Sequence, residues 1–82
     1  MPVILRIKGY RFWFYEADLD EPPHVHVSKD NKQAKFWLTP ISLAKANRFR
    51  DHEINEIYRI LQSFQDDILK TWQKEQEKHG NY

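Results

Sequence analysis

The sequence contains no cysteine, only two glycines and no long run of apolar residues. Without cysteine, the chain has no disulfide framework and no metal site of the thiolate type. Two glycines do not make a phosphate-binding glycine loop, so nothing supports nucleotide-cofactor chemistry. No apolar segment approaches the roughly 18 residues of a membrane span, and residues 1–6 lack the apolar core of a signal peptide. We therefore expect a cytoplasmic protein that needs no cofactor and contacts no membrane.

The composition is that of one small globular domain over residues 1–82, with 40% hydrophobic and 15% aromatic residues. The net charge of +1 hides an uneven distribution. Residues 1–50 carry nine Lys and Arg against five acids, which is 9 − 5 = +4, whereas residues 51–82 carry four against seven, which is 4 − 7 = −3. The basic half either binds an anionic ligand or is neutralised by the acidic half.

The first half of the chain has the pattern of two β-hairpins. Residues 3–7 and 10–15 are rich in β-branched and aromatic side chains and are separated by Lys8-Gly9, which favours a tight turn. Residues 24–28 and 33–38 are separated by a polar four-residue turn. The sheet is therefore expected over about residues 3–38. The connector at 39–50 is compatible with a short helix or with an extended segment.

The second half has a helical pattern. Apolar residues recur at helical spacing from Ile54 to Trp72, which predicts a helix over about 51–78 with Asp51 as its N-cap and a frayed tail after it. A straight helix of that length would extend roughly 40 Å. We therefore expect a kink between Ser63 and Asp67, or fraying after Trp72. The predicted fold is α+β, with a small antiparallel sheet of two hairpins packed on one long or kinked C-terminal helix.

The predicted register gathers basic and aromatic residues on one face of the sheet. It places Arg6 opposite Arg11, His26 opposite Lys35 and His24 opposite Trp37. If the helix covers the other face, the face left free displays Arg6, Arg11, Trp13, Tyr15, His24, His26, Lys35 and Trp37. Cations that contact phosphates and rings that stack on bases are what an RNA-binding surface needs. Aromatic residues and arginine are also enriched in protein interfaces, so this pattern fits both kinds of ligand.

The segment Glu21-Pro22-Pro23-His24-Val25-His26-Val27 places two histidines on the same side of a strand. They could be polar residues of a half-buried strand, hydrogen-bonded to the preceding acidic loop. They could also be an acid–base pair that cleaves RNA, with Lys35 offsetting charge on the phosphate. A third interpretation is a metal site completed by Asp20 or Glu21. No further ligand has convincing spacing, so the sequence assigns no metal ligand.

Four segments of the chain carry a recognisable pattern: Ile4–Ile7, Gly9–Phe12, Glu21–Val27 and Ala34–Leu38. This pattern resembles a family of short bacterial proteins that is classed as a domain of unknown function. The resemblance is looser in the second half, and Thr39 stands where many relatives have an aspartate. It implies a two-gene context, because such proteins are often encoded beside another small protein and are candidate toxin–antitoxin components. It assigns no catalytic residue.

These observations lead us to expect a toxin-like component of a bacterial two-gene module. It would bind RNA through Arg6, Arg11, Trp13, Tyr15 and Trp37, and would be a ribonuclease if His24, His26 and Lys35 are catalytic. Its protein partner would be a small antitoxin-like protein encoded nearby. The alternative is a non-catalytic regulatory module whose aromatic and basic sheet face docks a partner protein.

Overall fold

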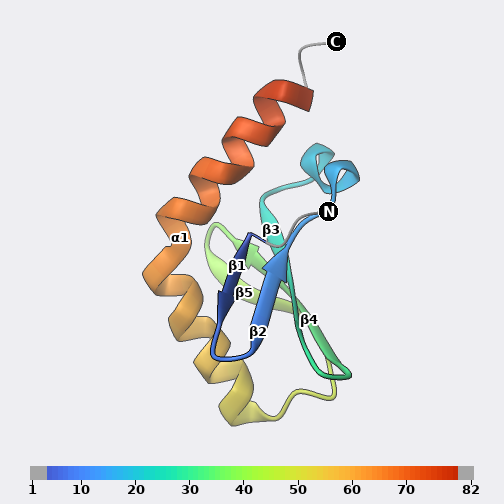
Figure 1. Cartoon of the computed structure of the whole chain (residues 1–82), viewed down its shortest axis with the longest axis vertical. Coiled ribbons are helices and arrows are strands. Elements are labelled where there is room, and N and C mark those ends of the chain that lie inside the picture. The colour runs from blue at the N-terminus through green and yellow to red at the C-terminus, as the bar shows by residue number, and fades with distance from the viewer. Residues whose placement is uncertain (1–3, 80–82) are drawn as a thin grey trace.

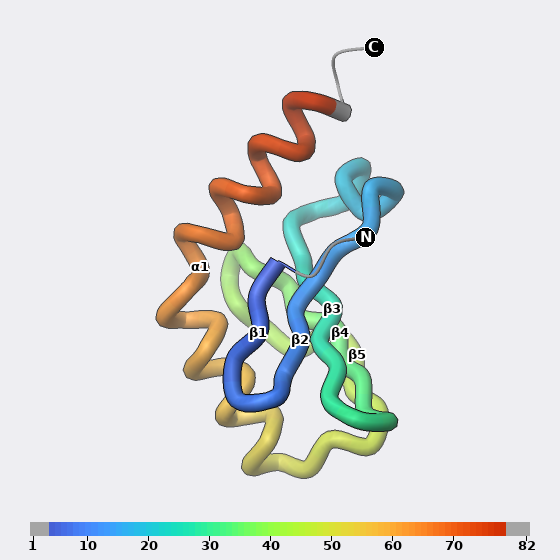
Figure 2. The backbone as a smooth tube through the Cα atoms, in the orientation of Figure 1, coloured from blue at the N-terminus to red at the C-terminus, as the bar shows by residue number. Residues whose placement is uncertain are grey.

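The computed structural model describes residues 4–79, which form a five-stranded antiparallel sheet and one long C-terminal helix. The strands pair in chain order, as Figure 2 shows along the tube. The elements are β1 (Leu5–Ile7), β2 (Tyr10–Trp13), the 3-10 helix η1 (Glu16–Asp20), β3 (His24–Lys29), β4 (Lys32–Leu38), β5 (Ile41–Asn47) and α1 (Asp51–His79). The predicted α+β fold, an antiparallel sheet with a C-terminal helix packed against it, is confirmed (Figure 1).

Tight turns fix the register of both hairpins. Lys8 and Gly9 have positive φ angles of 54° and 84°, as expected for a two-residue turn that matches the twist of its strands. The second turn is tighter than predicted, because Lys29 pairs with Lys32 and leaves only Asp30 and Asn31 in the loop. Asp30 has a φ of 55°, a conformation that aspartate tolerates better than most residues do.

The connector that the sequence left open contains a fifth strand. Strand β5 pairs antiparallel with β4. Lys35 pairs with Lys45 and Phe36 pairs with Leu43, so Ala44 is the extra residue of a bulge in β5. The turn between these strands contains one cis peptide bond, Thr39–Pro40. Segment 39–50 therefore adopts the extended alternative, and β5 adds a fifth strand to the sheet.

The N-cap of helix α1 lies one residue earlier in the chain than predicted. The backbone carbonyl of Arg50 accepts hydrogen bonds from the N–H groups of Glu53 and Ile54, and the Arg50 N–H donates to Oε1 of Glu53 at 3.1 Å. Arg50 is thus the N-cap, and the prediction of Asp51 was wrong. Among residues 4–79, no helix is both long enough and apolar enough to cross a membrane.

The helix is continuous to His79, so the fraying expected after Trp72 does not occur. Figures 1 and 2 show that its axis changes direction near its middle, where the kink between Ser63 and Asp67 was expected. Figure 1 shows its C-terminal part rising beyond the strands and lying beside η1. There Trp72 packs with Phe14 and Leu19 in a second hydrophobic cluster, and Nε2 of Gln76 donates to the Leu19 carbonyl at 3.1 Å. The segment η1 therefore extends the surface on which the C-terminal part of the helix packs.

The main core lies between α1 and one face of the sheet. Strand residues that share this face by register pack against the buried side of the helix. The buried members of this cluster are Tyr10, Phe12, Val25, Val27, Ala34, Phe36, Leu38, Ile57, Ile60, Leu61 and Ile68. Burial of these side chains removes their apolar surface from water and leaves the opposite face of the sheet to polar and aromatic residues.

Candidate functional site

The open face, meaning the face of the sheet opposite α1, carries three rows of side chains that the strand register defines. Cross-strand partners lie on the same face of a sheet. The first row is Arg6, Arg11, Ser28, Gln33 and Asn47; the second is Trp13, His26, Lys35 and Lys45; the third is His24, Trp37 and Ser42. The predicted pairs of Arg6 with Arg11, His26 with Lys35, and His24 with Trp37 are all present.

The first row begins with two arginines that face each other. Arg6 in β1 is directly opposite Arg11 in β2, and both side chains are exposed. Within residues 4–79, neither arginine forms a salt bridge with a carboxylate. Like charges directly opposed on a sheet repel each other and destabilise the pair. An anion bound between them would relieve that repulsion.

The second row forms a shallow depression across β3, β4 and β5. The depression has a volume of about 340 Å³ and is lined by His26, Gln33, Ala34, Lys35, Lys45 and Asn47. Lys45 is exposed and has no carboxylate partner among the described residues. It was missed by sequence reasoning because segment 39–50 had not been assigned to the sheet. The depression is therefore lined by two lysines, Lys35 and Lys45.

The third row continues into a second depression beside Trp37. This one has a volume of about 250 Å³ and is lined by Pro22, Pro23, Trp37, Thr39, Pro40 and Ser42. The ammonium of Lys35 lies 4.6 Å from the Trp37 ring centroid and 3.7 Å from the Glu21 carboxylate. A cation over an aromatic face is attracted to the ring. Trp37 thus presents a partly exposed ring next to a lysine.

At the end of the sheet nearest η1, Asp18, His24 and His26 come together; we call this group the histidine cluster. Nε2 of His26 is 2.9 Å from Oδ2 of Asp18, and Nε2 of His24 is 3.4 Å from Oδ1 of the same carboxylate. One ligand atom from each residue lies within 4.8 Å of the others. The carboxylate that meets the histidines is Asp18, not Asp20 or Glu21 as the third interpretation supposed.

His24 is completely enclosed. Its exposed fraction is 0%, and its ring lies 5.5 Å from Trp37 and 5.4 Å from Trp72, measured between centroids. The sequence placed it on a face open to solvent, and its register position is on that face. Because Trp72 of α1 packs over this end of the sheet, the side chain of His24 has no contact with solvent.

His26 is the partly exposed member of the pair. Its side chain is 24% exposed, and its ring stacks on Trp13 at a centroid distance of 5.7 Å. Tyr15, which follows β2 and is itself 49% exposed, lies 5.2 Å from the same ring. The predicted rings Trp13 and Tyr15 therefore frame His26, and solvent reaches the cluster from the side of His26 and Asp18.

Asp18 is positioned by the 3-10 helix η1. The backbone N–H of Tyr15 donates to Oδ2 of Asp18 at 2.8 Å. Burial alone would raise the pKa of the Asp18 carboxyl. The hydrogen bonds from Tyr15 and His26, together with the attraction of the two histidines in their protonated forms, outweigh burial and lower the pKa below its usual value. Asp18 is therefore held as a carboxylate facing two imidazoles.

Two members of this region were not identified from the sequence. Asp18 belongs to an acidic loop with several carboxylates. The one sequence signal that could have distinguished it is its position three residues after Tyr15, where an acid can cap a short helical turn. Trp72 was assigned to the core, which is where it lies. Its contact with His24 depends on how far α1 extends, and local sequence does not specify that.

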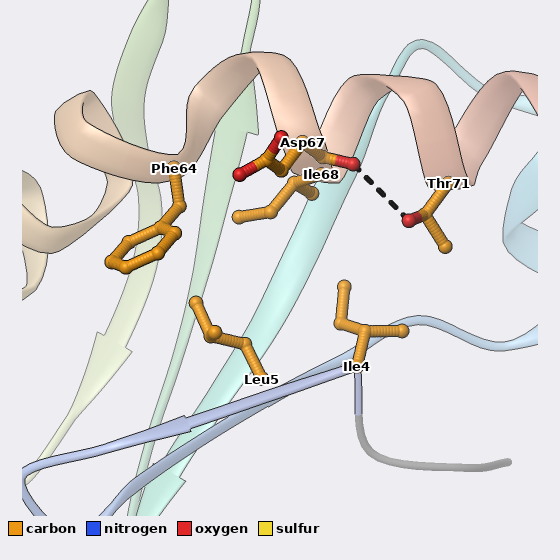
Figure 3. Close-up of a pocket in the computed structure, with 6 residues that line it drawn as sticks. All are labelled: Ile4, Leu5, Phe64, Asp67, Ile68 and Thr71. Carbon is orange, nitrogen blue, oxygen red and sulfur yellow. Dashed lines mark hydrogen bonds between the residues drawn. The ribbon is translucent and has the colours of Figure 1, made fainter.

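A third depression lies on the helix side of the sheet and is separate from the open face. Figure 3 shows Phe64 and Ile68 of α1 facing Leu5 and Ile4. Its volume is about 180 Å³, and its remaining lining residues are Asp67 and Thr71, whose hydroxyl donates to the Asp67 carbonyl at 3.1 Å. This lining is mainly apolar and lacks the histidines, so the candidate site remains the open face.

Comparisons with known proteins identify a family but no characterised relative. No curated protein and no solved structure gives a significant match. Residues 9–73 match a sequence family described as a domain of unknown function, DUF4160. The matched segment includes β2 to β5, the histidine cluster and most of α1. Since it covers more than half of the chain, this protein belongs to the DUF4160 family.

Proposed function

We propose that this protein binds single-stranded RNA through the open face of its sheet, as the toxin-like component of a bacterial two-gene toxin–antitoxin module in the cytoplasm. The observation that carries the proposal is the pair Arg6 and Arg11, which are opposed, exposed and without a carboxylate partner among residues 4–79. A phosphate group bound between these two cations would attract both and would relieve their mutual repulsion.

The rest of the open face supports the same ligand. Lys35 and Lys45 lie in the next row, within reach of a chain that continues from the arginines across the strands. Trp13, Tyr15 and Trp37 keep part of their rings exposed, and rings of this kind stack on unpaired bases. The two depressions beside His26 and Trp37 offer separate places for a phosphate and a base.

The proposal is limited to binding and does not include cleavage by a histidine pair. General acid–base catalysis requires each side chain to come within hydrogen-bond reach of the reacting atoms. His24 has no exposed surface, so it does not reach a phosphate on the open face. His26 and Lys35 remain accessible and contribute to the binding surface.

The test is fluorescence anisotropy with a labelled 12-nucleotide single-stranded RNA at several salt concentrations. If four cations contact phosphates, log K should fall with log salt concentration with a slope of about −3. The double variant Arg6→Gln/Arg11→Gln should bind at least about tenfold more weakly and with a smaller slope. The matched control is Arg59→Gln/Lys70→Gln, which removes two exposed charges from α1 and should bind as the wild type does. Equal losses in both double variants would contradict a specific role of the open face.

A second candidate function is a protein-binding module, favoured by the edge strand β5. It is seven residues long, pairs on one side with β4, and within the described residues has no strand on its other side. An extended segment of a partner, such as the antitoxin-like protein expected from the two-gene context, could add to that edge. In that case Ala44→Pro would abolish binding of the partner, whereas the double arginine variant would bind it normally.

The toxin assignment is tested in a bacterial host. Induced expression of the wild type should slow growth, and co-expression of the neighbouring gene should restore it. The Arg6→Gln/Arg11→Gln variant, at equal protein level, should not slow growth. Normal growth with the wild type would contradict the toxin assignment. RNA binding would then be judged by the anisotropy measurement alone.

A further inference from the structure

We propose that the histidine cluster, Asp18, His24 and His26, binds a divalent transition-metal ion of the Zn²⁺ type. Two imidazole nitrogens and one carboxylate oxygen are a common donor set for such ions. The proposal does not depend on RNA binding, because its ligand is different and its test measures metal binding alone, although His26 belongs to both surfaces.

The distances fit a shared ion. In a tetrahedral zinc site with bonds of about 2.0–2.1 Å, neighbouring ligand atoms are roughly 3.3 Å apart. Nε2 of His24 is 3.4 Å from Oδ1 of Asp18, while Nε2 of His26 is 2.9 Å from Oδ2. The second distance is that of a hydrogen bond, so the ion would replace a proton there and widen the gap by a few tenths of an ångström. The three ligand atoms lie within 4.8 Å of one another, so the pair that is farthest apart would have to close by up to about 1.5 Å when the ion binds.

The other nitrogen of His24 is already held. Nδ1 is 2.9 Å from the carbonyl oxygen of Pro22, which has no proton to give, so Nδ1 carries the hydrogen and donates. In the neutral ring this leaves Nε2 with its lone pair directed at the Asp18 side of the ring. A histidine that binds a metal through one nitrogen commonly donates the other N–H to a backbone carbonyl. The Pro22-Pro23 segment thus orients His24 for ligation through Nε2.

The second and independent observation is that Nε2 of His24 is buried without a hydrogen-bond partner among the described residues. It faces the carboxylate of Asp18 at 3.4 Å without hydrogen-bond geometry. A lone pair and a carboxylate oxygen facing each other in a buried site are unfavourable unless a positive charge lies between them. A proton on Nε2 or a metal ion would supply that charge, and the second histidine on the same carboxylate favours the metal.

The cluster leaves room for a fourth ligand on one side only. His24 is enclosed by Trp37 and Trp72, whereas Asp18 and His26 are 14% and 24% exposed. Three protein ligands with one position open to solvent is the arrangement of catalytic rather than structural zinc sites. A water molecule would occupy that position next to Tyr15, and a metal ion lowers the pKa of such a water.

The test is titration of the tag-free 82-residue chain with Zn²⁺ alone and with Co²⁺ alone. Isothermal titration calorimetry should give one Zn²⁺ per chain, Co²⁺ should produce visible absorption bands, and both ions should raise the Tm. His26→Ala, which alters a partly exposed side chain, and Asp18→Asn should each weaken binding by at least about tenfold. His52→Ala removes an exposed histidine at the start of α1 and should leave binding unchanged.

Three results would overturn the proposal. The first is no binding of Zn²⁺ at millimolar concentration, and the second is equal affinity in the wild type and His26→Ala. The third comes from ¹⁵N NMR of the histidine rings with Zn²⁺ present. If Nε2 of His24 still carries a proton, that proton rather than a metal neutralises the cluster. The expected result is an Nε2 of His24 that carries no proton and whose resonance shifts when Zn²⁺ binds.

Discussion

The two ends of the open face follow the same strand pattern but have opposite environments. At one end, Arg6 and Arg11 are exposed and lie close to the turn formed by Lys8 and Gly9. At the other end, His24 occupies an equivalent open-face position but has no exposed surface. The difference comes from what lies beyond the strand ends. Helix α1 and η1 extend over the histidine end, and no described element covers the arginine end (Figure 1).

This contrast shows that alternation along a strand predicts which face a side chain lies on but not whether solvent reaches it. The face of the sheet on which a side chain lies is set by the local backbone geometry. Exposure is set by distant segments, here residues 16–20 and the last turns of the helix. The same reasoning separates the two proposals, since an accessible surface suits a large ligand such as RNA and an enclosed cluster suits a single ion.

The largest effect is expected from opening the histidine end with Trp72→Ala. Trp72 is 1% exposed and packs against Phe14 at a ring-centroid distance of 4.8 Å and against His24 at 5.4 Å. Removing a fully buried tryptophan leaves a cavity and should lower the free energy of unfolding by about 3–5 kcal/mol. Urea denaturation monitored by circular dichroism measures the loss.

The control for this variant is Trp13→Ala, on the open face, where the ring is only partly buried. Its loss should be less than half as large, because solvent already contacts the ring. If Trp72→Ala does not fold, Trp72→Phe keeps most of the packing and should show a smaller loss in the same direction. Equal losses for Trp72→Ala and Trp13→Ala would mean that the histidine end is not the enclosed one.

Much of the sheet could be predicted from the sequence because its determinants are local. The turn at Lys8-Gly9 fixes the first hairpin, and alternation fixes which residues share a face, so the pairing of Arg6 with Arg11 and of His24 with Trp37 followed directly. The fifth strand could not be assigned, because the bulge at Ala44, opposite Lys35 and Phe36, shifts its register against β4. Alternation in β5 alone therefore gives a mixed signal.

The residues of the histidine cluster could not all be predicted from the sequence, for a different reason. Several acids precede His24, and local pattern does not rank them. Asp18 is selected because its carboxylate also accepts the hydrogen bond from the Tyr15 N–H, which fixes its side chain toward the histidines. The burial of His24 depends on Trp72, which is 48 positions away in the chain, and on an unbroken helix. Such long-range contacts follow from the packing of the whole domain.

An intermediate effect is expected at the point where the start of α1 is attached to the sheet. Glu53 is buried, and its carboxylate accepts hydrogen bonds from Nζ of Lys32 at 2.8 Å and from the Arg50 N–H at 3.1 Å. The hydrogen bond from Lys32 contributes most to lowering the pKa of Glu53 below its ordinary value. Because the folded state holds the proton less tightly, this contribution to stability is complete above the unfolded pKa of about 4.3 and is lost as the pH falls through the folded pKa.

The corresponding measurement compares the wild type with Glu53→Gln by urea denaturation at pH 7 and at pH 3. Glu53→Gln should be less stable than the wild type at pH 7, and the difference should shrink as the pH falls below about 4. The change should be smaller than that of Trp72→Ala, since no cavity is formed. A difference that stays constant between pH 7 and pH 3 would show that the charge of Glu53 does not attach the helix.

The smallest effect, and the one of opposite sign, is expected at the arginine end. Arg11→Gln removes one of two opposed charges and should raise the free energy of unfolding by a few tenths up to about 1 kcal/mol at low salt. At about 0.5 M salt the gain should nearly vanish, because the Debye length falls below the separation of the two side chains. Arg59→Gln, on the exposed side of α1, serves as the control and should change stability little at either salt concentration.

The same variant relates the repulsion to the proposed ligand. If the arginines are held ready for a phosphate, inorganic phosphate should raise the Tm of the wild type more than that of Arg11→Gln. A gain in stability on losing Arg11, combined with a loss of phosphate response, would mean that the sheet tolerates repulsion in order to bind an anion. If Arg11→Gln is instead destabilising at low salt, the two guanidinium groups are separated well enough not to repel. The arginine pair would then give no reason to expect an anion between them, and the case for RNA would rest on the lysines and the exposed rings alone.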